Sequence, residues 1–371
     1  MRLFLIYVVV LGVAVASAHR SAVAAMPVPA AVSAIRTLGG EVTIVESATG
    51  ISSISVDFSA SKVAVTDAVM SPLRQLSELE YLRLRGSKIT DAGLANLINA
   101  SRLRTLDISE TRITDAGVRH LERLGRLEVL CLWDTAITDD CLTSLRTLAR
   151  LRVLSLDGTK VTDAGLARLT PLTKLQELSL DDTAITDAGL ESIKNMSDLR
   201  WVSLVRTRIS DRGLASLPEM GSIRRLELSF TRITDTGLQS IKGLKSLETL
   251  DLTFTDVTDS GMVHLKGLKA LKRLGLVGTR VTDAGLLHLA SLRSLKGLDL
   301  SCTNVSDLGL GSLKGMTALQ CLNVCKTNVS QAGVTELELS LPHCAVVSDA
   351  KRKARSLPTA TIEPARTATK D

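Results

Sequence analysis

An aspartate recurs every 24 residues through most of this chain. It follows Thr or Ser, which follows Ile or Val, and it stands at positions 91, 115, 139, 163, 187, 211, 235, 259, 283 and 307. The register extends upstream to Asp67 and downstream to Gln331, where the acid is lost, so twelve units are legible. A fixed period without insertions predicts a stack of similar units, each burying its apolar face against its neighbours, rather than two or three separate globular domains.

Two apolar patterns keep the same register. The pattern Leu-x-x-Leu-x-Leu, as at Leu79, Leu82 and Leu84, has the alternation of a half-buried strand. After a turn comes Gly-Leu-x-x-Leu, as at 165–169, whose apolar residues have helical spacing. Each unit is therefore predicted to contain a strand, a turn and a short helix. Because aromatic residues make up only 2% of the chain and hydrophobic residues 45%, the core must consist of stacked aliphatic side chains.

These motifs resemble the leucine-rich repeat family over almost the whole chain after its first residues. The resemblance is to the helix-bearing subclass, as in ribonuclease inhibitor, and to bacterial secreted proteins with T-x-I-T-D-A-G-L repeats. It implies an α/β fold, a right-handed leucine-rich repeat solenoid or horseshoe with a concave parallel β-sheet and convex helices, in about 12 repeats of 24 residues.

Two polar rows recur with the repeats. The family usually has Asn or Cys where this chain has Thr, from Thr111 to Thr327, so the resemblance implies that this row bonds backbone groups of neighbouring turns. The recurrent Asp precedes each expected helix by one or two residues, where a carboxylate accepts from free backbone N–H groups. We predict that the Asp row caps the helices. Calcium binding by that row is disfavoured because its neighbours are Thr and Gly rather than further acids.

The N-terminal segment has the pattern of a secretory signal. Arg2 is followed by an apolar run and by Ala16-Ser17-Ala18, which predicts a signal peptide at 1–18 with cleavage between Ala18 and His19. The apolar run is too short to span a bilayer, and no other stretch of the sequence qualifies. We therefore expect a secreted or periplasmic protein without an integral membrane span.

The remaining segments follow from composition. We expect a linker at 19–29, an N-terminal cap at 30–62 with a short helix and strands at 41–46 and 51–58, repeats at 63–335, a C-terminal cap at 336–349 and a disordered basic tail at 350–371. In the C-terminal cap, the segment from Glu336 to Val347 is expected to replace the next strand with a closing turn at Leu341 to Cys344. The tail and Arg2 hold +5 of the net charge of +6, so the repeats lack the charge excess of a nucleic-acid binder, and we expect no nucleic-acid partner.

The sequence contains no recognisable catalytic or metal motif. It lacks G-x-S-x-G, H-E-x-x-H, a P-loop and C-x-x-C, and the strict period leaves no room for inserted catalytic loops. His264 and His288 share one helical phase but are too few for a zinc site. We expect no enzymatic activity, no cofactor and no metal.

Six cysteines occur in the chain. Cys302 with Cys325, and Cys321 with Cys344, come from adjacent strands and could approach bonding distance, although free thiols are the favoured state for either pair. Cys131 and Cys141 are expected to lie on different faces of one unit and to stay free.

The aromatic residues indicate where a partner binds. Phe58 is expected in the core, while the other aromatic residues after the leader fall at outward positions of the strands, where Trp, Tyr and Arg commonly anchor interfaces. The predicted partner-binding residues are Tyr81, Trp133, Trp201, Arg206, Arg225, Phe230 and Phe254. We therefore expect a monomeric, exported scaffold that binds a protein partner of unknown identity through its concave surface.

A second hypothesis is an intracellular adaptor, like the leucine-rich repeat half of F-box substrate receptors of ubiquitin ligases, with the N-terminus misread as a signal. It requires a helical adaptor-binding module before the repeats. The short segment between Ala18 and the first repeat instead resembles a repeat cap, which favours the exported scaffold.

Overall fold

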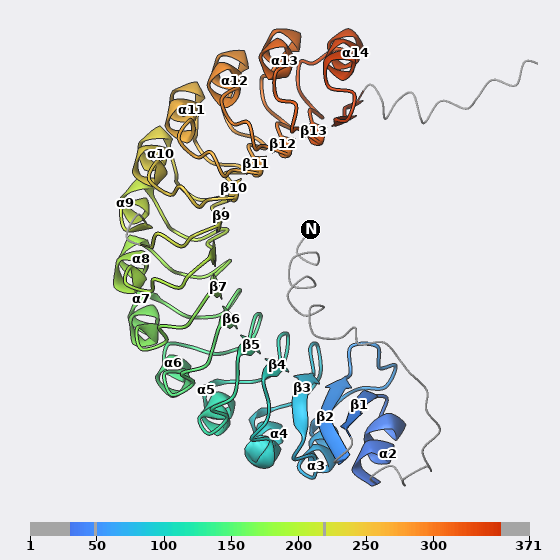
Figure 1. Cartoon of the computed structure of the whole chain (residues 1–371). Helices are drawn as coiled ribbons and strands as arrows, with labels where there is room; N and C mark the ends of the chain where they lie inside the picture. Colours follow the sequence, from blue (N-terminus) through green and yellow to red (C-terminus); the bar gives the residue numbers. More distant parts are fainter. Residues whose placement is uncertain (1–29, 48–49, 218–219, 350–371) are drawn as a thin grey trace, which may run out of the picture.

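The computed structural model describes residues 30–47, 50–217 and 220–349. The expected signal peptide at 1–18, linker at 19–29 and basic tail at 350–371 lie outside the described residues. The described chain curves into an open arc, with strands along its inner side and helices along its outer side (Figure 1).

Within the part of the chain that the structure describes, one sheet of fourteen strands follows the chain order. The strands are β1 (Glu41–Ser47), β2 (Gly50–Asp57), β3 (Leu79–Arg83), β4 (Thr105–Asp107), β5 (Val129–Cys131), β6 (Val153–Ser155), β7 (Glu177–Ser179), β8 (Trp201–Ser203), β9 (Arg225–Glu227), β10 (Thr249–Asp251), β11 (Arg273–Gly275), β12 (Gly297–Asp299), β13 (Cys321–Asn323) and β14 (Ala345–Val347). The first pair is antiparallel and the later neighbours are parallel, as in a stack of identical coils.

The helices line the convex side (Figure 1). They are α2 (Ala30–Thr37), α3 (Met70–Leu73), α4 (Asp91–Leu94), α5 (Asp115–Val118), α6 (Cys141–Leu145), α7 (Asp163–Leu166), α8 (Asp187–Ile193), α9 (Asp211–Leu214), α10 (Asp235–Ile241), α11 (Asp259–Leu265), α12 (Asp283–Leu289), α13 (Asp307–Leu313) and α14 (Gln331–Ser340). Short 3-10 turns accompany several of them, at Asp67–Val69, Ala95–Asn99, Arg119–Leu121 and Ala167–Leu169. The concave parallel sheet and the convex helices confirm the fold class that the family resemblance implied.

Columns of aliphatic side chains form the core. In the repeat of β10, Leu247, Leu250 and Leu252 are fully buried, and the strand register places Leu250 between Leu226 and Leu274 of the adjacent repeats. Each repeat thus buries its apolar residues against both neighbours, which is the main source of stability in such a stack. Phe58 is buried in this core, as expected.

The C-terminal end departs from the expectation. The segment from Glu336 to Val347 does not replace the next strand, because β14 pairs in parallel with β13 and Val346 takes the place of the next core leucine. That prediction is wrong. The Leu341 to Cys344 turn joins α14 to this strand, so the apolar column continues for one more coil.

The recurrent Asp does not cap its own helix, and this prediction is also wrong. Asp211 is the first residue of α9, and its carboxylate accepts hydrogen bonds from Thr234 of the following repeat, from the backbone N at 2.7 Å and from Oγ1 at 2.5 Å. Thr234 in turn caps α10 by accepting from the Thr236 N–H.

The same pair of bonds recurs eleven times, from Asp67 with Thr90 to Asp307 with Ser330. We call this column the aspartate ladder. Because each acid bonds to the next coil, the ladder ties successive repeats together by charge-assisted hydrogen bonds.

The Thr row acts within one coil rather than between coils, contrary to expectation. The Thr231 hydroxyl, for example, donates to the Leu228 carbonyl at 2.5 Å. Thr111 and Thr303 donate in the same way to Ile108 and Leu300. A hydroxyl three residues after a carbonyl reaches it within the turn, so the row closes the turn locally.

The glycine of the repeat makes room for the ladder. A Cβ atom on Gly213 would lie 2.5 Å from Oδ1 of Asp187, far inside normal contact. In one repeat Cys141 stands at this position, and there the helix begins at Cys141 instead of at Asp139. A side chain at this place is therefore accompanied by a later helix start.

Candidate functional site

The concave surface carries the outward residues of the strands and of the turn that follows each strand. One column in that turn has a left-handed backbone in every repeat from β3 to β13. It consists of Gly86, Glu110, Asp134, Gly158, Asp182, Arg206, Phe230, Phe254, Gly278, Cys302 and Lys326. We call this column the left-handed row.

Three consecutive members of this row form an aromatic ridge, made of Arg206, Phe230 and Phe254. The Phe rings are stacked with centroids 4.8 Å apart and planes 26° apart, and the Arg206 guanidinium lies 4.5 Å from the Phe230 centroid. Phe230 is 41% exposed and Phe254 48% exposed. The ridge is thus an ordered apolar surface that remains open to solvent.

The ridge continues into the next repeat through a glycine. A Cβ atom on Gly278 would lie 2.5 Å from Cδ1 of Phe254, so the ring rests directly over the Gly278 backbone. At the other end, Arg206 lies 3.9 Å from Asp182. The rings are therefore held in place along the row from both sides.

The backbone at the ridge is strained. Phe230 has φ of 59° and Phe254 has φ of 53°, a conformation that suits glycine and costs other residues roughly 1–2 kcal/mol each. Gly86, Gly158 and Gly278 occupy the same place in other repeats. The fold accepts glycine here, so packing alone does not explain the bulky rings.

Trp201 lies near the other end of its strand, between Glu177 and Arg225 in the register of the sheet. Arg225 stands 5.4 Å from the Trp201 ring centroid and pairs with Glu227 at 3.0 Å. Trp201 Nε1, Glu177 Oε2 and Arg225 Nε are buried and have no hydrogen-bond partner among the described residues. Burial raises the pKa of Glu177, and the Arg225 charge partly opposes that rise.

Tyr81 and Trp133 lie apart from these groups. Trp133 is covered by Arg85, whose guanidinium is 4.3 Å from the ring centroid. Tyr81 is half-buried on β3, and burial together with Asp57 raises the pKa of its hydroxyl to about 12. Trp133 and Phe230 stand four repeats apart, about 19 Å along the sheet. The seven predicted residues are thus distributed over four places instead of forming one patch, and their role in binding stays a prediction.

Asp157 and Asp181 form an acidic cluster between these places, which the sequence analysis did not predict. The Ser203 hydroxyl donates to Asp181 Oδ1 at 2.5 Å, and the Val205 N–H donates to the same oxygen at 2.9 Å. The pKa of Asp181 is raised to about 7, first by burial and then by the Asp157 charge. The recurrence of Asp157 and Asp181 at a spacing of 24 was a visible signal for this cluster.

Comparison with known sequences and structures agrees with this geometry. Two family models, both described as leucine rich repeat, match the chain, one at residues 221–281 and the other at 101–121, 172–194 and 291–314. This chain is a leucine-rich repeat protein. A search of curated proteins finds no match to its sequence.

Solved structures that resemble this leucine-rich repeat protein include an internalin, inlF, from Listeria monocytogenes str. 4b F2365, at a TM-score of 0.61 and 24% identity, over 80% of this chain and 86% of that one. A TDR receptor has a TM-score of 0.49 and 17% identity, over 74% of this chain and 51% of that one. The protein LIC12759 of Leptospira interrogans has a TM-score of 0.48 and 16% identity, over 76% and 87%. The first of these supports the fold and nothing more specific.

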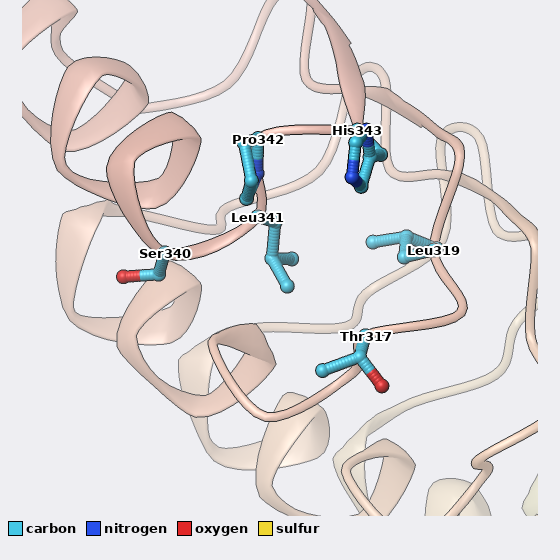
Figure 2. Close-up of a pocket in the computed structure, with 6 residues that line it drawn as sticks. All are labelled: Thr317, Leu319, Ser340, Leu341, Pro342 and His343. Atoms are coloured by element: carbon cyan, nitrogen blue, oxygen red, sulfur yellow. The ribbon is translucent and has the colours of Figure 1, made fainter.

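A small hollow lies at the C-terminal end of the leucine-rich repeats. Figure 2 shows the residues around it, which are Thr317, Leu319, Ser340, Leu341, Pro342 and His343. Its volume of about 110 Å³ is well below the range of roughly 300–1,000 Å³ usual for small-molecule sites. The hollow therefore offers no room for a substrate of ordinary size.

Cys131 and Cys141 are free and buried, and Cys302 and Cys321 are free and exposed. Within the described ranges, no three His, Cys, Asp or Glu side chains gather into a possible metal site. Over the same ranges, every helix falls short of the length and apolar character that crossing a bilayer requires.

Proposed function

We propose that this leucine-rich repeat protein is an exported scaffold that binds a protein partner through its concave surface, with the aromatic ridge as the main anchor. The observation that carries the proposal is the stacked pair of Phe230 and Phe254 in a left-handed backbone. An exposed ring that is kept at a cost in stability indicates a role in binding, because natural proteins retain such strain mainly at functional sites.

The ridge has the properties of an interface hot spot. Trp, Tyr and Arg side chains dominate the binding energy of many interfaces, and an aromatic ring buries a large area while losing little conformational freedom. The stack with Arg206 and the support from Gly278 order these side chains before a partner arrives. The surrounding sheet, about 50 Å long at about 4.8 Å per strand, is large enough for a protein.

Two further parts of the proposal rest on the sequence. The pattern at 1–18 supports export, with a mature chain that starts at His19. The regular repeats and the absence of known catalytic motifs from the sequence support a binding role without enzymatic activity. Mass spectrometry of the N-terminus in cell fractions tests export, and an intact Met1 on cytosolic protein would contradict it.

The test of the ridge compares partner capture by three forms of the chain. Phe230→Gly with Phe254→Gly removes the rings and leaves a residue that the left-handed backbone accepts. Leu287→Ala with Leu308→Ala is the matched control, because both leucines are exposed and belong to the convex helices α12 and α13. We expect the control to capture the same proteins as the wild type and the ridge variant to lose them.

Equal capture by the ridge variant and the wild type would overturn the assignment of the site. Circular dichroism of each variant shows whether the fold is retained.

A further inference from the structure

A basic groove runs along the starts of the strands in the C-terminal half of the concave surface. Its volume is about 600 Å³, and it is formed by the first residue of each strand from β9 to β13 and the residue before it. Its charged members are Arg224, Arg225, Lys272, Arg273 and Lys296, with Glu248 as the acid among them. The average charge of the repeats concealed this local excess of positive charge.

Several of these cations are not neutralised inside the protein. Arg224 and Lys272 share the carboxylate of Glu248, at 3.3 Å and 2.7 Å. The side chains of Arg273 and Lys296 are exposed and have no hydrogen-bond or ion-pair partner among the described residues. The groove therefore presents unpaired donors to a negatively charged ligand.

A glycine opens the floor of the groove. Gly297 occupies the first position of β12, and a Cβ atom on it would meet only Cγ of Arg273, at 3.7 Å, an ordinary contact. Packing therefore tolerates a side chain at this position. The glycine leaves room above the strand instead.

A row of acids borders the groove on the side toward the ends of the strands. Glu227, Asp251 and Asp299 are the third residues of β9, β10 and β12, two residues beyond the groove and about 7 Å from it along each strand. A ligand with negative charge on all sides would place some of it against this row. An extended peptide directs alternate side chains to opposite sides, so it can turn carboxylates to the cations and neutral groups to the acids.

We propose that this groove binds an extended acidic segment of a protein, with Asp or Glu at alternate positions. The proposal rests on the proposed function, since it gives the chemistry of one part of the partner. The strand starts from β9 to β13 span about 19 Å, which six residues of extended chain match with three carboxylates on one side. Arg and Lys bind such carboxylates by charge-assisted hydrogen bonds.

The experiment measures binding of a labelled peptide of alternating Glu and Ser to the purified chain at low salt. Charge-matched sulfated oligosaccharide and single-stranded DNA serve as competitors. We expect the peptide to bind and to be displaced weakly by the other two. Arg273→Glu with Lys296→Glu should weaken binding about tenfold or more, and Gly297→Val, which fills the floor without changing charge, should weaken it as well.

Arg112→Glu with Lys160→Glu is the matched control, because both side chains are exposed cations outside the groove. It should bind the peptide as the wild type does. No binding by the wild type, an equal loss in the control, or tighter binding of the oligosaccharide or the DNA would each overturn the proposal. The ridge variant should keep full peptide affinity, so failure of the ridge and failure of the groove give different results.

Discussion

The aspartate ladder and the left-handed row both run through successive repeats, yet they differ in how much their residues vary. In the ladder, an acid and a hydroxyl recur from Asp67 and Thr90 to Asp307 and Ser330. In the left-handed row, residues as different as Gly, Asp, Phe and Lys occupy the same backbone conformation. Where a side chain must bond to the next coil, one chemistry recurs. Where neighbouring repeats share only the backbone conformation, the side chain is free to serve a partner.

The largest expected effect comes from removing one step of the ladder. Asp211→Ala leaves the Thr234 N–H and hydroxyl without their acceptor, so we expect the free energy of unfolding to fall by about 3 kcal/mol. Urea unfolding measures this. The control is Asp256→Ala, which removes an exposed pair with Arg280 and should cost less than about 1 kcal/mol. Equal losses would mean that the ladder is no stronger than a surface ion pair.

Two glycines of α13 allow the steric requirement of the aspartate ladder to be distinguished from the effect of helix propensity on stability. A Cβ atom on Gly309 would overlap Oδ1 of Asp283, so Gly309→Ala should destabilise the chain by about 2 kcal/mol. Gly311 has open space around its Cβ position, so Gly311→Ala should stabilise the same helix by about 0.5–1 kcal/mol. Thermal and urea unfolding of both variants compare them directly. A gain in stability from Gly309→Ala would contradict the tight approach of the ladder.

The acidic cluster on the concave surface should make the stability of the chain depend on pH. The pKa of Asp181 is raised to about 7 in the folded chain, above its unfolded value, so its contribution to stability is present at low pH and is lost as pH rises through 7. Asp181→Asn should remove this loss. We expect the difference in unfolding free energy between the two proteins to change by roughly 1–2 kcal/mol between about pH 5.5 and pH 7. Parallel pH profiles would exclude a raised pKa at this residue.

The smallest effect tests the strain at the ridge. At Phe254, with φ of 53°, replacement by Gly should leave the chain more stable than replacement by Ala by about 1 kcal/mol. Both variants lose the ring stack, so the comparison isolates the backbone. The order is the reverse of that expected at Gly311. If Phe254→Ala proves the more stable variant, the strain argument for the ridge fails.

Much of the architecture was predictable because it depends on local pattern. The alternation around Leu82 predicted a strand, the Gly-Leu-x-x-Leu spacing predicted a helix, and the shared phase of Phe230 and Phe254 predicted neighbouring rings, which the stack confirms. The bonding of the polar rows was not predictable in the same way. Because every row has the same period, the period cannot tell whether Asp211 bonds to its own helix or to Thr234 one coil later.

The sequence by itself therefore determined the repeating coil, since the positions of apolar residues within 24 residues decide which side of a strand or helix is buried. Only the tertiary structure decided which side chains meet across coils, including the aspartate ladder and the basic groove. Residues such as Arg273 and Lys296 are distant along the chain and become neighbours when their strands pair in parallel. The basic groove forms because the stacking of coils places these strand starts side by side. No single repeat contains that arrangement.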